Sequence, residues 1–235
     1  MRILLVLLTL TLSLPLAADP LLIAAGAGYK KPLTEIYAAF TQSTGTKVEA
    51  VFGNLQQVLA QTRDSGRVDL VVGEQAFLAK SGLFSRDQTL GTGRLVLAYG
   101  ARRLAGYQSL TDPAVTRIGL PDPQKAIYGK AATQFLERSG LLPQVKGKLM
   151  TLSTVPQVSA YLIAGTIDAG FLNVTDALGI ADKIAGYDEL PAGLYDQPVI
   201  VLAVPKDRPE STASKSFADF IGQDGARAIL TRYGL

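Results

Sequence analysis

The sequence predicts an α/β protein made of two lobes that are joined by two crossing strands, with a ligand cleft between the lobes. Three observations lead to this prediction. Apolar runs typical of buried strands alternate with segments of helical periodicity along the chain. The length of 235 residues is enough for two lobes of about 100 residues each. Two longer apolar runs, residues 95–99 and 199–204, stand apart and enclose a second α/β unit.

The first 18 residues have the pattern of a secretion signal. Met1-Arg2 gives a short positive start, residues 3–16 are almost entirely apolar or hydroxyl-bearing, and Ala17-Ala18 supplies small residues before Asp19. The apolar run is shorter than the roughly 20 residues that a membrane-spanning helix needs. No cysteine is present to carry a lipid. We expect residues 1–18 to be a cleaved signal peptide and the mature protein to be a soluble, non-lipidated protein of the periplasm.

The segment that follows the signal predicts parallel strands connected by helices. Strand-like runs and helical stripes alternate in it, at residues 21–25 (strand), 33–40 (helix), 48–52 (strand), 55–62 (helix) and 69–72 (strand). The helical stripes end near Gly45 and Gly66, and glycine is the residue most often found just after a helix. This β-α-β-α-β order favours a parallel sheet.

The second unit repeats the alternation, and the last segment returns to the first lobe. We predict strands and helices at residues 117–120 (strand), 126–138 (helix), 156–164 (helix), 169–172 (strand) and 216–231 (helix). The predicted division is residues 19–96 plus 204–235 for lobe 1 and residues 97–203 for lobe 2. Two crossings between lobes make a hinge. No internal repeat is visible in the sequence.

The composition excludes many classes of function. The chain has no cysteine and no histidine, which excludes disulfide scaffolds, zinc fingers, imidazole metal sites and catalytic triads built on either residue. The net charge of +3 is too small for a nucleic-acid-binding surface. A ligand must therefore be held by backbone amides, hydroxyls, carboxamides, carboxylates or cations. We expect no cofactor, no protein-bound metal and no nucleic-acid partner.

Four predicted strand-to-helix junctions carry residues suited to an anion. They combine glycine, proline and the natural N-cap Asn54 with the free amides of a first helical turn, which attract negative charge. In an α/β sheet such carboxyl-end junctions face the ligand crevice. The junctions lie at residues 26–32, 52–57, 122–128 and 153–157. The first of them does not continue as G-x-G-x-x-G, so a dinucleotide site is not favoured.

Six stretches carry a resemblance to a known family. They are residues 24–33, 52–58, 69–73, 127–130, 170–177 and 232–235, and the spacing between them also matches. On these stretches the sequence resembles the periplasmic molybdate-binding component of ABC importers, which has the type 2 periplasmic-binding-protein fold. The resemblance implies a binding protein rather than an enzyme, a small oxyanion such as molybdate or tungstate as ligand, and the membrane permease of an ABC importer as partner. We expect a monomer.

The resemblance also implies which residues contact the anion. Carried over position by position, the contacts fall at Gly28 (flanked by Ala27 and Tyr29), Leu55 (flanked by Asn54 and Gln56), Lys125, Val155 and Asn173. The family usually has hydroxyls at the first two positions, a small residue at the third and a tyrosine at the fifth. We expect backbone amides to serve at Gly28, Leu55 and Val155. We further expect the Lys125 ammonium to touch the anion directly and Asn173 to donate from its carboxamide.

Two other hypotheses stay open beside this one. A secreted binding protein of the same fold could take another anion, such as sulfate, an organic phosphate or a carboxylate, because Lys125, Asn173 and Gln56 suit a ligand with more polar edges. An enzyme would have to rely on carboxylates, Lys, Tyr or Ser. No carboxylate pair stands out, since Asp69 and Asp176 have the positions of fold-supporting residues. For Lys125, the competing hypothesis is that its side chain points to solvent and only its backbone amide matters.

Overall fold

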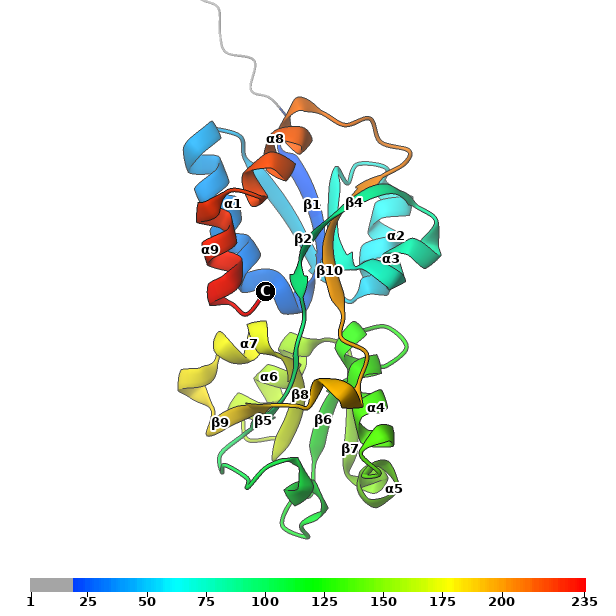
Figure 1. Cartoon of the computed structure of the whole chain (residues 1–235), viewed down its shortest axis with the longest axis vertical. Coiled ribbons are helices and arrows are strands. Elements are labelled where there is room, and N and C mark those ends of the chain that lie inside the picture. Colours follow the sequence, from blue (N-terminus) through cyan, green and yellow to red (C-terminus); the bar gives the residue numbers. More distant parts are fainter. Residues whose placement is uncertain (1–18) are drawn as a thin grey trace, which may run out of the picture.

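The computed structural model describes residues 19–235, which form two α/β lobes stacked along the long axis of the molecule (Figure 1). The predicted signal peptide, residues 1–18, lies outside the described residues. Each lobe contains one five-stranded sheet, of order β2-β1-β3-β10-β4 in lobe 1 and β7-β6-β8-β5-β9 in lobe 2. The predicted arrangement of two α/β lobes is therefore confirmed.

Lobe 1 is built around a buried parallel pair of strands. β1 pairs in parallel with β2 and β3, and β10 pairs antiparallel with β3 and β4. Its strands are β1 (Leu21–Gly26), β2 (Val48–Gly53), β3 (Leu70–Glu74), β4 (Phe84–Thr92) and β10 (Val199–Pro205). Its helices are η1 (Ala27–Tyr29), α1 (Lys30–Thr44), α2 (Leu55–Ser65), α3 (Gln75–Ser81), α8 (Thr212–Ile221) and α9 (Asp224–Arg232).

Lobe 2 has the same strand arrangement. β6 pairs in parallel with β7 and β8, while β5 pairs antiparallel with β8 and β9. Its strands are β5 (Leu95–Tyr99), β6 (Ile118–Pro121), β7 (Leu149–Leu152), β8 (Ala169–Asn173) and β9 (Gly186–Glu189). Its α-helices are α4 (Ile127–Arg138), α5 (Leu142–Val145), α6 (Val155–Ile163) and α7 (Val174–Leu178), with short 3-10 turns η2 (Tyr107–Thr111), η3 (Lys146–Lys148), η4 (Ala181–Lys183) and η5 (Ala192–Leu194). The two lobes thus share a topology that no sequence repeat reveals.

The C-terminal segment packs on lobe 1, as predicted. α8 and α9 lie beside α1 (Figure 1), and Phe217 of α8 meets Phe40 of α1 edge to face, with ring centroids 5.1 Å apart. The single helix predicted over residues 216–231 is wrong. The chain forms two helices there, interrupted at residues 222–223, because Gly222 ends α8 and Gln223 then adopts the extended conformation of an N-cap.

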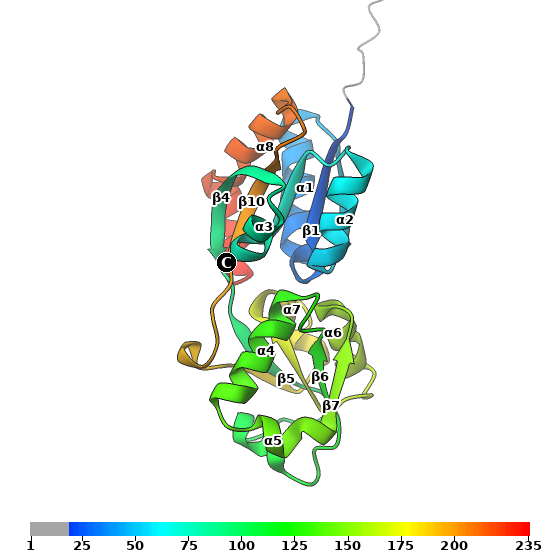
Figure 2. The ribbon, with the colours of Figure 1, turned by 90° about the vertical axis from the view of Figure 1, so that its right-hand side faces the viewer.

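The chain crosses between the lobes twice, and in Figure 2 both crossings run down the same side of the molecule. Sheet membership places the crossings at residues 93–94, between β4 and β5, and at residues 190–198, before β10. The amide of Gly93 donates to the carbonyl of Pro198 at 2.7 Å and ties the two crossings together. The predicted boundaries after residue 96 and before residue 204 fall inside β5 and β10. We propose instead that the boundaries lie in the two crossings, residues 93–94 and 190–198.

Among residues 19–235, no helix has both the length and the apolar character needed to cross a membrane.

Candidate functional site

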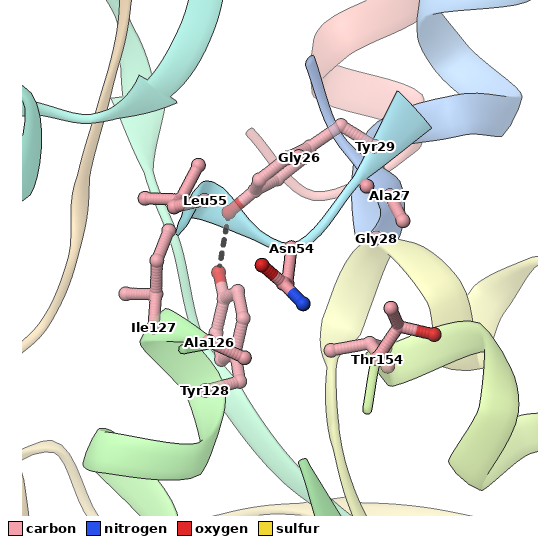
Figure 3. Close-up of a pocket in the computed structure, with 12 residues that line it drawn as sticks. Gly26, Ala27, Gly28, Tyr29, Asn54, Leu55, Ala126, Ile127, Tyr128 and Thr154 are labelled. Atoms are coloured by element: carbon pink, nitrogen blue, oxygen red, sulfur yellow. Dashed lines mark hydrogen bonds between the residues drawn. The ribbon is translucent and has the colours of Figure 1, made fainter. Parts of the chain in front are cut away.

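A pocket of about 340 Å³ lies between the lobes, at the point where helices of both lobes begin (Figure 3). The first residues of α2, α4 and α6 line it, and so does the whole of η1. The amides of a first helical turn have no partner within their helix, and aligned peptide dipoles give that end a partial positive charge. Gly26, Gly53, Asn54, Ala126, Tyr128 and Thr154 complete the lining.

The pocket is uncharged. No Asp, Glu, Lys or Arg occurs among the described residues that line it, and its ionisable side chains are Tyr29 and Tyr128. Burial is the main cause that raises the pKa of both hydroxyls, so both are neutral at pH 7. Helix N-termini attract an anion, and among the described residues the lining holds no carboxylate to serve as the countercharge that a cation would need.

Among the described residues that line the pocket, Asn54 is the one carboxamide. It is the N-cap of α2, as predicted: its Oδ1 accepts from the Gln57 amide at 3.0 Å, and the Gln57 side chain accepts from the Asn54 amide at 2.9 Å. This reciprocal capping box fixes which way the carboxamide points. The nitrogen is therefore turned away from the helix and into the pocket, on the side of Thr154 (Figure 3). Asn54 offers a preoriented N–H donor.

Thr154 holds the equivalent place at the start of α6 in lobe 2. Its hydroxyl oxygen accepts from the Gln157 amide at 3.3 Å, and the Gln157 side chain accepts from the Ser153 amide at 2.7 Å. Pro156 is the second residue of α6, so Val155 provides the first amide of the helix, as the sequence predicts for a proline at a helix start.

Two tyrosines meet across the cleft. The hydroxyls of Tyr29, from lobe 1, and Tyr128, from lobe 2, are 2.7 Å apart (Figure 3), and the residues are 2% and 3% exposed. A Cβ added at Gly93 would collide with the Tyr128 hydroxyl and lie 3.2 Å from that of Tyr29. The pair therefore rests against the crossing between β4 and β5.

Six of the nine predicted site residues line the pocket. They are Ala27, Gly28, Tyr29, Asn54, Leu55 and Val155. The Leu55 amide, predicted to bind the anion, donates to the Lys125 carbonyl of the other lobe at 3.2 Å. This contact brings the second and third predicted positions together through their backbones.

Gln56 and Lys125 lie at the rim of the cleft. The Gln56 carboxamide nitrogen donates to the Gln124 carbonyl of lobe 2 at 3.1 Å. The Lys125 side chain is 48% exposed, and its ammonium lies 3.2 Å from the Asp122 carboxylate. The Gln124 amide and then the Lys125 ammonium hold the pKa of the Asp122 carboxyl below its usual value. This geometry favours the hypothesis in which the Lys125 side chain faces solvent.

Asn173 lies behind Gly28 rather than in the pocket lining. It is fully buried at the end of β8, and its Nδ2 donates to the Gly28 carbonyl across the cleft at 3.0 Å. Its Oδ1 accepts no hydrogen bond from the residues that the structure describes. A Cβ on Gly28 would lie 3.0 to 3.3 Å from the three carboxamide atoms of Asn173. Gly28 therefore makes room for the Asn173 side chain.

A further contact between the lobes lies beside Asn173. The Lys31 ammonium of α1 donates to the Gly179 carbonyl, which follows α7. Asp176, in α7, is buried and accepts from the Ser159 hydroxyl of α6. Burial raises the pKa of the Asp176 carboxyl, while Ser159 and Lys31 act in the opposite direction. The other predicted fold-supporting residue, Asp69, accepts from the Leu22 amide at 2.8 Å.

Sequence reasoning missed four lining residues of lobe 2: Ala126, Ile127, Tyr128 and Thr154. All four lie in helix-start junctions that the sequence analysis placed at the cleft. The signal for their involvement was thus present, but the side chains that point inward depend on where α4 and α6 begin. α4 begins at residue 127, so the pocket receives the residues that follow Lys125.

Comparison with known proteins identifies the family. Residues 21–235 match the family model of the bacterial extracellular solute-binding proteins. The chain belongs to this family. This solute-binding protein is 26% identical to the molybdate-binding protein ModA of Rhodobacter capsulatus, over 97% of this chain and 92% of the relative. The resemblance stated from the sequence is confirmed, and the chain belongs to a family of binding proteins rather than of enzymes.

Solved structures confirm the fold of this solute-binding protein. It matches the periplasmic molybdate-binding protein of Azotobacter vinelandii with a TM-score of 0.82 and 24% identity, over 91% of this chain and 97% of the other. It matches L-phospholactate-bound PEB3, from Campylobacter jejuni, with a TM-score of 0.73 and 14% identity, over 91% and 98% of the two chains. The predicted periplasmic-binding-protein fold is thus confirmed.

Proposed function

We propose that this solute-binding protein captures a molybdate- or tungstate-like oxyanion in the periplasm and delivers it to the membrane permease of an ABC importer. The observation that carries the proposal is the convergence of the helix starts of both lobes on one uncharged pocket. The similarity to relatives from Rhodobacter capsulatus and Azotobacter vinelandii that are named molybdate-binding proteins also supports the proposal. The ligand is the whole oxyanion, and the metal enters as part of it.

In this proposal the contacts are mostly backbone amides. We assign donors to the first turns at Ala27, Gly28 and Val155, with the Asn54 carboxamide as the main side-chain donor; the Leu55 amide is already bonded to the Lys125 carbonyl. About four charge-assisted hydrogen bonds, each contributing roughly 1.5–3 kcal/mol, can offset desolvation of the anion and closure of the hinge. Micromolar affinity needs about −8 kcal/mol. Amides alone therefore suffice without a cationic side chain.

Thermal unfolding with a panel of anions tests the ligand. Molybdate and tungstate are expected to raise the melting temperature of the mature protein, and sulfate less, because its smaller radius leaves the pocket loosely closed. A ligand at 100 times its Kd stabilises the native state by about 2.7 kcal/mol. If no tetrahedral oxyanion shifts the transition while an organic phosphate or carboxylate does, the oxyanion proposal is wrong.

A groove beside the pocket favours a second candidate, an organic phosphate or carboxylate. It shares Ala126 and Ile127 with the pocket and is open to solvent, and the charged side chains that line it are Lys80 of α3, Lys130 of α4 and Glu74. A ligand with an anionic head in the pocket and a longer body would have room along this groove. The likeness to a protein solved with L-phospholactate is consistent with such a ligand.

Export completes the proposed function. Intact-mass analysis of a periplasmic extract is expected to show a chain that begins at or close to Asp19. A full-length species retained in the membrane would contradict the assignment of residues 1–18 as a cleaved signal.

A further inference from the structure

The hydroxyl pair of Tyr29 and Tyr128 joins equivalent places of the two lobes. Tyr29 is the N-cap of α1, the helix after the first strand of lobe 1, and Tyr128 is the second residue of α4, the helix after β6 in lobe 2. Their hydroxyls are 2.7 Å apart and their ring centroids 6.4 Å apart, in a tilted arrangement. Ninety-nine positions separate the two residues in sequence. The contact exists only when the lobes are brought together.

The pair lies at the hinge end of the cleft. A side chain at Gly93 would collide with the Tyr128 hydroxyl, so the tyrosines touch the backbone of the first crossing. The Gly93 amide in turn donates to the Pro198 carbonyl of the second crossing at 2.7 Å. Rotation of one lobe about these crossings therefore moves Tyr29 relative to Tyr128, whose contact Figure 3 draws as a dashed line.

Breaking this contact has an energetic cost. Each hydroxyl is buried, and opening the cleft exchanges the bond between the two hydroxyls for bonds to water, so the closed cleft is favoured by the modest net gain of one buried hydrogen bond. The bond is made by protein atoms alone, so it acts on the lobes whatever anion the pocket holds. Its geometry also limits how closely the lobes approach at the back of the pocket, where both rings form part of the wall.

We propose that Tyr29 and Tyr128 are positioning residues for ligand capture: their hydroxyl pair, seated on Gly93, is a latch that holds the lobes at the angle of the closed cleft. The latch slows opening and so lengthens the time that a bound ligand stays enclosed. The inference rests on the proposed function only in the choice of molybdate as a probe.

The first test measures the separation of the lobes without any added ligand. β2 and β7 are the edge strands farthest from the crossings in their sheets, and Glu49 and Thr151 are exposed on them. Because the chain has no cysteine, labels can be attached after Glu49→Cys and Thr151→Cys alone. Tyr29→Phe and Tyr128→Phe are expected to shift the label separations to longer values. Identical distance distributions in wild type and both variants would overturn the latch.

A matched control keeps the result specific. The Tyr99 hydroxyl donates to Asp188 at 2.6 Å within lobe 2, so Tyr99→Phe also removes a partly buried hydroxyl bond. This variant is expected to lower the melting temperature without changing the label separation. If Tyr99→Phe widens the separation as much as Tyr29→Phe does, the effect is general loosening and the latch is overturned.

The second test uses molybdate dissociation. Tyr29→Phe and Tyr128→Phe are each expected to raise the dissociation rate constant about 3- to 10-fold, and the double variant no more than either alone, because one shared bond is lost. If the double variant instead raised the dissociation rate constant by the product of the two single effects, the proposal would be overturned. If wild type does not bind molybdate, the proposed ligand fails, while the label separation still decides the latch.

A substitution at Gly93 tests the same contact from the backbone against which the tyrosine hydroxyls lie. Gly93→Ala is expected to push the Tyr128 hydroxyl away and to lengthen the label separation as Tyr128→Phe does. In a Tyr128→Phe chain the colliding atom is gone, and the nearest ring atom in the wild type, Cζ, lies 3.2 Å from the added Cβ. The same alanine should then add little. An equal added effect in both chains would contradict the seating of the latch on Gly93.

Discussion

Helices α3 and α7 follow β3 and β8, the middle strands of the two sheets, yet they begin in different ways. Glu74, the last residue of β3, accepts from the amides of Ala76 at 3.1 Å and Phe77 at 2.6 Å and so caps its own helix. Asn173, the last residue of β8, makes no side-chain cap on α7. It donates instead to Gly28 of the other lobe.

This difference between Glu74 and Asn173 distinguishes the stability of a lobe from the closure of the cleft. A side chain that caps its own helix stabilises one lobe, and its loss is expected to lower the free energy of unfolding by about 1 kcal/mol. A side chain that leaves its helix uncapped and bonds to the opposite lobe stabilises only the closed cleft. Glu74 and Asn173 occupy equivalent positions in the two lobes, but Glu74 stabilises the fold of lobe 1 whereas Asn173 stabilises the closed cleft. The following changes test this division, from the largest expected effect to the smallest.

Gly28→Ala is expected to weaken molybdate binding the most. The added Cβ lies within 3.0–3.3 Å of the Asn173 carboxamide, so Asn173 must move and its bond to Gly28 is strained. Overpacking of this kind costs about 1–3 kcal/mol, which calorimetry would measure as a loss of affinity. Adding Asn173→Ala is expected to restore part of the loss. Gly147→Ala, where no atom of residues 19–235 lies within 4 Å of the new Cβ, is the control. Full affinity in Gly28→Ala would remove the cross-cleft contact from the closing mechanism.

Asn54→Ala and Thr154→Ala compare the caps of α2 and α6. Each is expected to reduce the free energy of unfolding by about 1 kcal/mol, because each removes an N-cap, and chemical denaturation would measure it. Only Asn54→Ala should also weaken binding, by roughly another 1–2 kcal/mol, since its carboxamide nitrogen faces the pocket. Equal losses of affinity in the two variants would show that capping, and not donation, explains the effect.

Asp176→Asn tests the buried acid at the third residue of α7, where α3 has Phe77. Burial raises the pKa of Asp176 in the folded state, so its stabilising contribution is present below the carboxyl's usual pKa and is lost as the pH rises through the raised value. Asp176→Asn is therefore expected to raise the melting temperature at pH 7 and to leave it nearly unchanged near pH 3. A variant less stable than wild type at pH 7 would show that the charge of Asp176, facing Lys31, is favourable.

Lys125→Ala is expected to have the smallest effect. Its ammonium pairs with Asp122 at the exposed rim, and such pairs contribute about 0–1 kcal/mol. Calorimetry should give an affinity close to that of the surface control Lys206→Ala. A tenfold loss in Lys125→Ala alone would instead place the ammonium on the anion, as the sequence first suggested.

Much of the fold follows from local sequence patterns. The strand at residues 95–99 and the helices near 126–138 and 156–164 agree with the structure within one residue at each end, because their apolar side chains face a core. β4 was not predicted. Its residues 85–88 are polar, and what makes them a strand is antiparallel pairing with β10, more than a hundred positions later.

The site was predictable only in part, for a related reason. A helix start depends on residues that are neighbours in the sequence, so the four junctions and the Asn54 cap could be predicted from the sequence. The direction of a single side chain depends on the partner it finds, and that partner can be near or distant in the chain. Lys125 turns to Asp122, three positions before it, whereas Asn173 turns to Gly28 and Tyr29 to Tyr128 in the other lobe. No periodicity encodes the last two contacts, because they arise when two separately folded lobes meet.

The strand order of lobe 1 has a consequence for the order in which the two lobes fold. β3 and β4 do not pair with each other, since both pair with β10, which consists of residues 199–205. The sheet of lobe 2 is encoded without interruption between residues 95 and 189. A chain that becomes available for folding N-terminus first therefore completes the lobe 2 sheet earlier, while β3 and β4 each keep an unpaired edge until residues 199–205 follow. The first lobe to be translated is thus the last to be finished.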